Sequence, residues 1–328
     1  MTKRLPIILP LLAMIGALSL TRSCEDNTAE ENSIAQEQRF FNIYMAANYP
    51  GAVLQPSGIF FLENKEGTGD MPGDSSWLFI DHVAYTIPED QVYETYLENV
   101  ALDVRSIYDT AALYGPYKVR SDYINEGFTE GLKLMREGGE ATFMFTSDLG
   151  YGNNSSKVGG FTSLKYEVRL LEVIEDIESY EEEKILAYTD TIAGVQALLD
   201  TIDNVFMYYV IDESTEGAPV DADSTIEVAY KGYLTDGRVF DESDEDSGIT
   251  FTVDDENSGI IIGWDLGLKE FKEGEKGRLI IPYQLAYGPD GEFTSRGNTS
   301  IPPYETLVFD IEVLSVEADG DGVKPEEE

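Results

Sequence analysis

The residues of the C-terminal half that could form a site are aromatic, with one carboxylate among them. Tyrosine, phenylalanine and tryptophan recur between residues 230 and 309, whereas the only histidine, His82, and the only cysteine, Cys24, lie far away along the sequence. A nucleophile with its base, or a cluster of His and Cys metal ligands, is therefore not encoded there. The chemistry open to these residue types is noncovalent, because such a site can bind an apolar group and strip water from it. Taken singly, each aromatic residue would more often belong to a hydrophobic core.

A second kind of chemistry is suggested by the carboxylates that follow Asp241. Residues 242–246 read Glu-Ser-Asp-Glu-Asp, and clustered carboxylates suit a hard cation such as Ca²⁺. The run lacks the distal ligand of a complete calcium-binding loop. We therefore favour a solvated acidic loop over a calcium site, and expect no metal and no cofactor.

The elements that would position these residues occur twice in the sequence. Gly127-Phe128 and Tyr151-Gly152 enclose a segment in the first half, and Gly263-Trp264 and Tyr287-Gly288 enclose a segment of the same length in the second. The match extends outwards. It pairs Val83-Ala84-Tyr85 with Val228-Ala229-Tyr230, Tyr108-Asp109 with Phe240-Asp241, and residues 164–167 with 307–310. Such internal repetition predicts two homologous domains.

Each copy is expected to be an antiparallel sheet crossed by one short helix, an α+β fold. Short apolar runs bounded by Gly, Pro and Asp predict strands at 59–62, 79–87, 205–211, 225–234, 279–281 and 306–314. Helical spacing before a glycine predicts one helix in each copy. The residues concerned are Phe128, Leu132 and Met135 before Gly138, and Trp264, Leu268 and Phe271 before Gly274.

Helices are also expected outside the two sheets. Phe40, Ile43, Tyr44 and Ala47 have helical spacing and predict an amphipathic helix on the first domain, at the end of a solvated tether. Residues 180–202 predict a connecting helix, although Gly194 weakens it. The expected organisation is an export signal at 1–23, tether and helix at 24–57, a first domain at 58–176, a helical linker at 177–204, a second domain at 205–318 and an acidic tail at 319–328.

The N-terminus has the features of an export signal. Lys3 and Arg4 precede an apolar run at 6–20, which is shorter than the roughly 20 residues needed to cross a bilayer. Cys24 resembles the lipid-modified first residue of a bacterial lipoprotein, and the acidic pair after it resembles the start of many Bacteroidetes lipoproteins, although Thr21 and Arg22 depart from the usual pattern. We expect export and lipid anchoring at the cell envelope, with the outer membrane favoured. A free cysteine in an uncleaved leader is the alternative.

The charge of the chain excludes one class of partner. It has 63 acidic and 22 basic residues, and a formal net charge of −41 at pH 7. Binding to nucleic acid without sequence preference needs Lys and Arg to neutralise phosphates, so no nucleic-acid partner is expected. The same charge argues against docking on anionic lipid through a basic patch, and membrane attachment would come from the lipid on Cys24.

Several motifs of the second copy together identify a family. They are Val228-Ala229-Tyr230-Lys231-Gly232, Asp236-Gly237-Arg238-Val239-Phe240-Asp241, Ile260-Ile261-Ile262-Gly263-Trp264, Ala286-Tyr287-Gly288, Ile301-Pro302-Pro303 and Leu307-Val308-Phe309-Asp310. In this order and spacing they resemble the FKBP-type peptidyl-prolyl isomerases, closely over 205–316 and loosely over 58–176. The resemblance implies an antiparallel half-barrel around one helix, with an apolar pocket for a proline ring. Proline-containing polypeptides, and macrolides of the immunophilin type, are the implied ligands.

The resemblance also implies the roles of individual residues. The catalytic residues would be Tyr230, Phe240, Asp241, Trp264, Tyr287 and Phe309, with Phe251, Ile260, Ile261 and Ile301 binding substrate. Rotation of a prolyl bond faces a barrier of about 18–20 kcal/mol, and a site that desolvates the imide and favours its twisted form lowers it without a nucleophile. Two features depart from the family: no basic residue follows Asp241, and the loop at 289–300 is long, with Phe293 and Arg296.

The first copy keeps the outline of these motifs and loses detail. Its candidates are Tyr85, Tyr108, Asp109, Phe128, Tyr151 and Tyr166, with an insertion at 87–106. His82, beside Asp81, is expected to be a paired structural residue, and the copy to be a binding or spacing domain. Two functions remain open: an exported isomerase and chaperone, or a non-catalytic lipoprotein that serves assembly of the envelope, such as a secretion or gliding apparatus.

Overall fold

The computed structural model describes residues 12–122, 124–153, 155–201, 204–244 and 247–317, with only the backbone given for 12–28. The chain forms two compact units that interleave in sequence. The first unit takes residues up to 71, 82–95 and 122–170, and the second takes 72–81, 96–121 and 171 onwards. The expected boundaries at 58–176 and 205–318 are therefore too simple, because segments of the first copy pack within the second unit.

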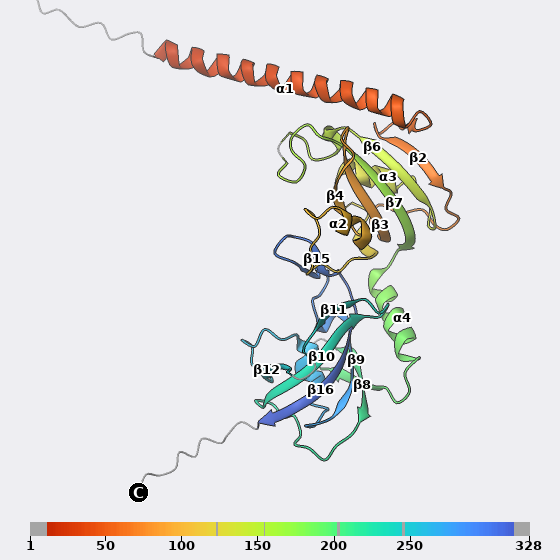
Figure 1. Cartoon of the computed structure of the whole chain (residues 1–328), viewed down its shortest axis with the longest axis vertical. Coiled ribbons are helices and arrows are strands. Elements are labelled where there is room, and N and C mark those ends of the chain that lie inside the picture. The colour runs from red at the N-terminus through yellow and green to blue at the C-terminus, as the bar shows by residue number, and fades with distance from the viewer. Residues whose placement is uncertain (1–11, 123, 154, 202–203, 245–246, 318–328) are drawn as a thin grey trace, which may run out of the picture. The chain divides into compact units, whose positions relative to one another are not determined.

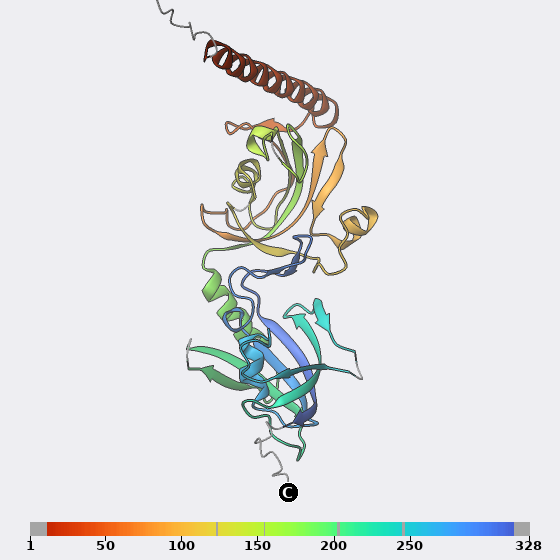
Figure 2. The ribbon, with the colours of Figure 1, turned by 90° about the vertical axis from the view of Figure 1, so that its left-hand side faces the viewer.

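The first unit contains an antiparallel sheet around one helix. Its strands are β1 (Val53–Leu54), β2 (Phe60–Lys65), β3 (Trp77–Ile87), β4 (Gln91–Thr95), β6 (Glu140–Phe145) and β7 (Ser163–Ile174), in the order β1-β2-β6-β7-β3-β4. Helix α3 (Glu126–Leu132) lies inside the curve of the sheet (Figure 2). Phe128 and Leu132 of α3 are fully buried and Met135 beyond it is 3% exposed, so the predicted apolar stripe is confirmed.

The second unit repeats this arrangement (Figure 1). Its main sheet is antiparallel, in the order β11-β10-β16-β13-β9-β8, and β12 also pairs with β10. The strands are β8 (Gln196–Asp200), β9 (Val205–Glu213), β10 (Thr225–Leu234), β11 (Val239–Glu242), β12 (Ile249–Thr252), β13 (Lys276–Ile281) and β16 (Leu307–Glu317). Helix α5 (Ile262–Leu268) buries Trp264 and Leu268, with Phe271 just beyond it. The predicted α+β class is confirmed in both units.

Repeated glycines allow each helix to approach its sheet closely. A Cβ on Gly131 would lie 2.5 Å from the ring of Phe143, and a Cβ on Gly263 would lie 2.3 Å from Ile281. Contacts under 3.0 Å are not tolerated by real Cβ atoms. The glycines of the repeated pairs therefore set the distance between helix and sheet. These pairs are Gly127-Phe128 and Gly131-Leu132 in the first copy, and Gly263-Trp264 and Gly267-Leu268 in the second.

Helix α1 (Leu12–Asn48) differs from the expectation of a tether ending in a short helix, since it is continuous over 37 residues. Of the predicted apolar face only Tyr44 is buried: Phe40 and Ile43 are 47% and 57% exposed, and Ala47 is exposed as well. The residues buried with Tyr44 are Glu37, Phe41 and Met45. Glu37 is buried because its carboxylate accepts hydrogen bonds from the Ser147 N–H, the Ser147 hydroxyl and the Ser163 hydroxyl, each at 2.7 Å. Hydropathy alone could not predict the buried face, because that face includes a carboxylate whose hydrogen bonds are made within the protein.

The expected linker helix is correct only in its first half. Helix α4 (Ile177–Thr189) begins at the Asp176 cap, whose carboxylate accepts from the backbone of residues 178 and 179. Gly194 then adopts φ +76°, and residues 196–200 form strand β8 at the edge of the second sheet. Leu198 and Leu199 therefore pair with β9. Ile192 and Val195 pack instead against the cluster of Ile185, Ile280 and Val308. Ile202 lies outside the described residues.

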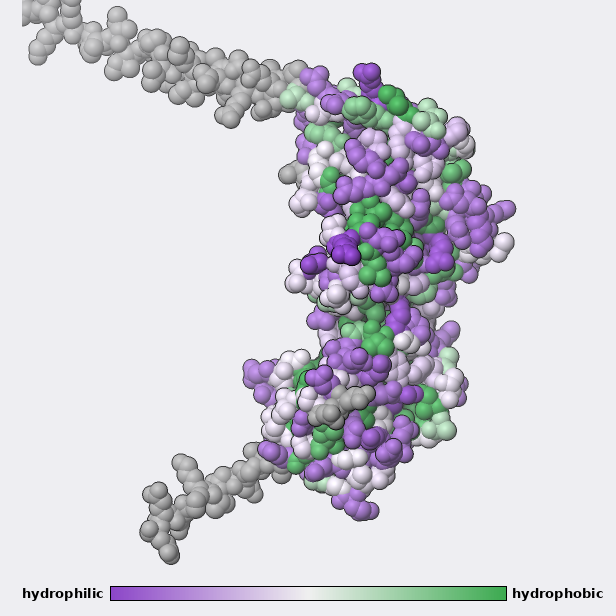
Figure 3. Space-filling view, in the orientation of Figure 1, coloured by the Kyte–Doolittle hydropathy of each residue, from purple (hydrophilic) through white to green (hydrophobic). Residues whose placement is uncertain are grey.

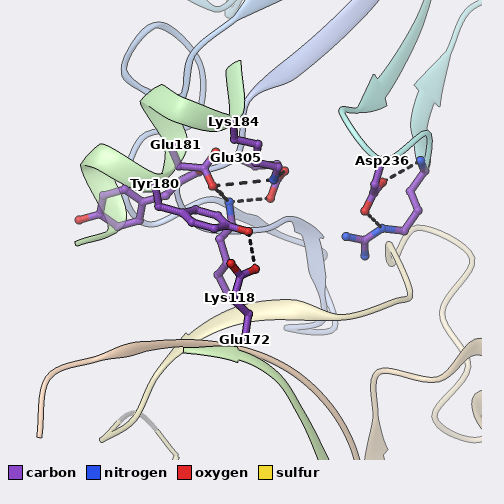
Figure 4. A network of polar contacts seen from close by, with 9 residues as sticks. Lys118, Glu172, Tyr180, Glu181, Lys184, Asp236 and Glu305 are labelled. Atoms are coloured by element: carbon purple, nitrogen blue, oxygen red, sulfur yellow. Dashed lines mark hydrogen bonds and ion pairs between the residues drawn. The ribbon is translucent and has the colours of Figure 1, made fainter. Parts of the chain in front are cut away.

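A buried ion cluster explains why part of the first copy belongs to the second unit (Figure 4). Strand β5 (Tyr117–Arg120), which pairs with the first four residues of β3, carries Lys118 into the unit, where the residue is 2% exposed. The Lys118 ammonium lies 2.7 Å from Glu181 on α4 and 2.8 Å from Glu305. It also donates to the carbonyl of Tyr304 at 2.8 Å, and Lys184 lies 3.0 Å from Glu305.

The molecular surface agrees with the composition of the chain. The face drawn in Figure 3 is mainly hydrophilic, with small apolar areas between polar ones. No helix in the described part of the chain is long and apolar enough to cross a membrane. Lys3, Arg4 and the first part of the predicted export signal lie outside the described residues, and Cys24 falls within α1 where only the backbone is given.

Candidate active site

The floor of the site in the second unit is the indole ring of Trp264, on the first turn of α5. The residue is 3% exposed. Tyr230 and Phe309 meet the indole edge to face, with ring centroids at 5.1 and 5.2 Å and interplanar angles of 85° and 86°. Phe251 lies at 5.8 Å from the other side. Edge-to-face packing is a favoured geometry of aromatic pairs, so the four rings fix one another.

Strand register brings these rings to one face. Gly232 of β10 lies opposite Phe309 of β16, and Tyr230 is two residues before Gly232, so it projects to the same side as Phe309. Phe240 meets Phe309 at 5.5 Å and 87°. A Cβ on Gly232 would lie 2.7 Å from Phe240 and 2.9 Å from Phe309, which means that only glycine allows these rings to meet here.

Isoleucines and a polar rim complete the site. Ile301 is 3% exposed and shares the core cluster with Trp264, against which Ile260 and Ile261 are partly buried. The hydroxyl of Tyr230 donates to Asp241 at 2.5 Å. The structure thus brings together all the predicted residues of the second copy around α5, with Tyr287, which is 36% exposed, beside Tyr230 and Asp241 at the edge.

The tyrosines of the rim stay protonated at neutral pH. Burial, and then the hydrogen bond to Asp241, raise the pKa of Tyr230 well above its ordinary value. Burial also raises the pKa of Tyr287, helped by the charges of Glu292 and Asp241. Among the described residues, the Asp241 carboxylate accepts hydrogen bonds from the Tyr230 hydroxyl and the Glu242 N–H, and no lysine or arginine pairs with it. The site therefore offers hydroxyl donors and one uncompensated carboxylate.

One main-chain donor at the start of α5 has no hydrogen-bond partner among the described residues. The N–H of Ile260 donates to the Ser258 hydroxyl at 3.3 Å, and the carbonyl of Ile261 accepts from the Trp264 N–H at 3.0 Å. The N–H of Ile261 makes no hydrogen bond with a described residue. Because a helix begins here, this N–H points out of the helix and can bind a peptide carbonyl.

The long loop after Tyr287 is held by the segment 96–121 within the second unit. The loop contains a small hairpin, β14 (Glu292–Phe293) with β15 (Thr299–Ile301). The Asp109 carboxylate accepts from the Thr294 hydroxyl at 2.7 Å and from the Asn298 amide at 3.1 Å, which holds the pKa of Asp109 below its ordinary value. The Leu113 N–H donates to the Thr299 carbonyl at 2.9 Å, and the Leu113 side chain is buried in the core cluster of Trp264.

This placement corrects one prediction. Tyr108 and Asp109 were expected to match Phe240-Asp241 in a pocket of the first copy, but both lie in the second unit. Tyr108 stacks on Tyr114 at 5.7 Å, and its carbonyl accepts from Arg296 at 2.9 Å. Their resemblance to the pocket pair is a coincidence of residue type, and their contacts fix the loop.

The true counterparts in the first unit are Tyr93 and Glu94. In the second unit Gly232 pairs with Asp241 and Tyr233 with Val239, so that Phe240 is the extra residue of a bulge. In the first unit Ala84 pairs with Glu94 and Tyr85 with Val92, which makes Tyr93 the extra residue of the same bulge. The signal was present in the sequence, since Val92-Tyr93-Glu94 repeats the pattern of Val239-Phe240-Asp241.

The same register corrects the counterpart of Tyr230, which is His82 and not Tyr85. His82 meets the ring of Phe128 at 5.7 Å, as Tyr230 meets Trp264. The Tyr85 hydroxyl donates to Glu167 at 3.0 Å, as Tyr233 donates to Asp310 at 3.1 Å. The predicted alignment of the two copies was therefore shifted by three residues on this strand, and the proposed insertion at 87–106 contains β4 and helix α2 (Glu98–Asp103).

The site of the first unit has a different chemistry. His82 is 1% exposed and its Nε2 lies 3.3 Å from Glu94, so it is a paired residue as predicted. Tyr166, at 4.8 Å from Phe128, stands where the second unit has Phe309. Its hydroxyl is bonded by Tyr93 at 2.6 Å and by the amide of Asn125 at 3.1 Å. Polar groups thus occupy the depth of this site.

Comparisons with known proteins agree with this geometry. The family model for FKBP-type peptidyl-prolyl cis-trans isomerases matches residues 90–171 and 216–314, more than half of the chain. The first matched segment begins at 90 and so includes Tyr93 and Glu94. Within the second, Tyr230, Trp264 and Phe309 all fall inside the match.

Individual relatives match over shorter lengths. The FKBP-type peptidyl-prolyl cis-trans isomerase FkpA of Escherichia coli strain K12 is 43% identical over 111 residues, which are 34% of this chain and 37% of that protein. FK506-binding protein 2 of Yarrowia lipolytica is 36% identical over 140 residues, 42% of this chain and 92% of that protein. The chain thus matches only about a third of the length of FkpA.

Two solved structures are also similar to the chain, each with a low TM-score. The crystal structure of FkpA from Escherichia coli is 35% identical, with a TM-score of 0.35, and the match covers 43% of this chain and 60% of that one. The three FKBP domains of wheat FKBP73 are 18% identical, with a TM-score of 0.32, over 80% of this chain and 97% of that one. From the extent of the family match, the chain belongs to the FKBP-type peptidyl-prolyl cis-trans isomerases.

Proposed function

We propose that the second unit catalyses cis–trans isomerisation of Xaa-Pro bonds in exported polypeptides and so assists their folding. The observation that carries the proposal is the aromatic site itself, in which Tyr230, Phe251 and Phe309 surround the buried indole of Trp264. Its walls are apolar and its polar groups lie at one edge. Prolyl isomerisation is slow enough to limit folding, which gives such an activity a use.

The mechanism we propose needs no covalent step. The proline ring would enter over Trp264, and the imide would leave water for an apolar site that favours the twisted form, in which the carbonyl no longer conjugates with nitrogen. The Tyr287 hydroxyl would donate to a substrate carbonyl, and the free N–H of Ile261 would hold the peptide main chain. Asp241 would orient Tyr230. An FK506-type macrolide would occupy the same pocket.

The test is the exchange rate of a short Xaa-Pro peptide, measured by NMR with the full chain. We expect acceleration by the wild type, a clear loss in Trp264→Leu, and a smaller loss in Tyr287→Phe, which removes one hydroxyl. The matched control is Tyr151→Phe, the same change at the counterpart position in the first unit, and it should leave the rate unchanged. A folded wild type that gives no acceleration would favour a non-catalytic binding protein.

The place of action is a separate proposal. We propose that the chain is exported and anchored to the bacterial envelope through a lipid on Cys24, because a basic start and a short apolar run precede the only cysteine. The test is mass spectrometry of the mature protein. A diacylglycerol adduct on an N-terminal Cys24, absent from Cys24→Ser, would support the anchor, whereas an unmodified Cys24 within a longer chain would refute it.

A further inference from the structure

The counterpart of the proline pocket in the first unit already holds a cation of the chain itself. Lys157 belongs to the loop between Tyr151 and Ser163, and its ammonium forms an ion pair with the carboxylate of Glu94. The same ammonium lies 5.9 Å from the ring centroid of Tyr93 and 5.8 Å from that of Tyr151. Two aromatic rings and a carboxylate therefore surround one alkylammonium group, which is the arrangement of a cation–π site.

The groups around this ammonium are fixed by other contacts. The rings of Tyr93 and Tyr151 meet edge to face, at 6.4 Å and 80°. The Tyr93 hydroxyl is 2.6 Å from that of Tyr166, and His82 lies 3.3 Å from Glu94 on the inner side. Burial alone would raise the pKa of Glu94, but His82 and Lys157 outweigh it and bring that pKa to about 2. The carboxylate is thus held as an anion with its open side toward the cation.

The same substitutions make this site unsuited to a proline ring. Where the second unit has Phe240, Phe309 and Ile261, the first has Tyr93, Tyr166 and Asn125, whose polar atoms bond to one another in its depth. An apolar ring that entered as deeply as in the second unit would have to separate these bonded atoms and leave them without partners, and the second unit has no such cost. The charge of Glu94 instead favours a positively charged ligand.

Lys157 is the part of the site that can leave. Its side chain is 48% exposed, whereas that of Glu94 is 19% exposed. Its loop contains Gly152 and Gly159, both with positive φ. A lysine of another chain would form the same ion pair with Glu94, so it can replace Lys157 at small cost. The net charge of −41 also draws cationic polypeptides toward the protein.

We propose that the first unit binds a lysine side chain of a client polypeptide between Tyr93, Tyr151 and Glu94, in competition with Lys157. Lys157 acts as an internal occupant that lowers the apparent affinity for the client. The two copies then recognise different features of a polypeptide, a lysine in the first unit and a proline in the second. The proposal does not depend on isomerase activity.

The test uses the ring signals of His82, the only histidine of the chain, as an NMR reporter beside Glu94. The full chain is titrated with Ac-Gly-Lys-Gly-NH₂ and with the matched peptide that has norleucine in place of lysine. We expect the lysine peptide to shift the His82 signals, the norleucine peptide to leave them in place, and Lys157→Met to bind the lysine peptide about fivefold or more tightly than the wild type. Glu94→Gln in the Lys157→Met background should abolish this binding.

Each other outcome overturns the proposal. Equal affinity in the wild type and in Lys157→Met would mean that Lys157 does not occupy the site. Shifts of the His82 signals with the norleucine peptide would mean that the site binds the aliphatic stem and does not recognise the charge. Binding that survives Glu94→Gln but is lost in Asp241→Asn would place the lysine in the second unit. Melting curves of each variant, followed by circular dichroism, show that it is folded at the titration temperature.

Discussion

Replacement of Lys118 by methionine tests the idea that a buried ion cluster holds the second unit together. Methionine keeps most of the volume of the lysine stem and removes only the charge. In the wild type the side chain of Lys118 is 1% exposed, and those of Glu181 and Glu305 are 2% and 4% exposed. The variant therefore leaves two carboxylates out of water, with only Lys184 to offset them, at 3.8 Å from Glu181 and 3.0 Å from Glu305.

The expected loss of unfolding free energy is about 3–5 kcal/mol, the cost of removing one partner of a buried pair. For a unit of this size that corresponds to a fall of roughly 6–20 °C in the melting temperature. Figure 4 shows why the loss is not local, since β5, α4 and the loop that contains Glu305 all meet at the Lys118 ammonium. That loop lies between Ile301 and Phe309 of the candidate site, so the proposed isomerase activity should fall in parallel.

The stability deficit of Lys118→Met should depend on pH in a definite direction. In the wild type burial raises the pKa of Glu181, while Lys118 and Lys184 outweigh burial at Glu305 and lower its pKa. Without Lys118 both carboxyl groups have raised pKa values in the folded state. A group with a raised folded pKa gains stability as pH falls, so the deficit of the variant should shrink between about pH 7 and pH 4.

Urea unfolding at several pH values, followed by tryptophan fluorescence, measures this deficit. The matched control is Lys231→Met, which breaks an ion pair with Glu242 whose partners are 51% and 58% exposed. It should change stability by no more than about 0.5 kcal/mol. A deficit below about 1 kcal/mol in Lys118→Met, or one that does not shrink in acid, would refute the reasoning.

Three further predictions concern the two sites. Asp109→Ala should release the loop that contains Thr294 and change the preference among Xaa-Pro peptides while leaving the melting temperature nearly unchanged; equal rate ratios across a peptide series would contradict this. Gly232→Ala should lower isomerase activity at least tenfold in a folded protein, because a Cβ there lies 2.7 Å from Phe240; an unchanged rate would show that the rings can move apart. Glu94→Gln should cost stability above pH 4.5 and none as pH falls through about 2, since the folded-state pKa is depressed to about 2; a deficit that persists in acid unfolding curves would mean that charge is not its cause.

The residues of the second site could be predicted because each of them lies within a sequence motif that fixes its place on a helix or strand. Trp264 follows Gly263, the glycine that allows α5 to approach the sheet closely. Phe309 lies in a strand motif of β16 and is paired with Gly232 of β10. Given the resemblance to the family, the order of the aromatic residues in the sequence was enough to predict that their rings lie together. What sequence could not supply was the segment that holds the loop above the site, because Asp109 and Thr294 are 185 residues apart.

The first copy was misread where two segments of similar composition competed. Tyr108-Asp109 and Tyr93-Glu94 both have an aromatic residue followed by an acid, and only Tyr108-Asp109 was matched with Phe240-Asp241. Only the pairing of Ala84 with Glu94, with its bulge at Tyr93, decides between them. A similar limit applies to α1, where Glu37 is buried by three hydrogen bonds that hydropathy cannot foresee.

Under the two proposals made above, one backbone carries two kinds of recognition. In both sites a polar side chain on the strand that crosses the helix contacts an acid on the neighbouring strand. The pair is Tyr230 with Asp241 in the second unit and His82 with Glu94 in the first. In the second unit the pair lies at the edge and leaves an apolar floor at Trp264, which suits an imide that must lose water. In the first unit tyrosine replaces phenylalanine on both sides of the pair, and the acid, now within the site, needs a cation. On these proposals, small changes in the polarity of the walls, and not changes in the fold, decide which group of a polypeptide each unit binds.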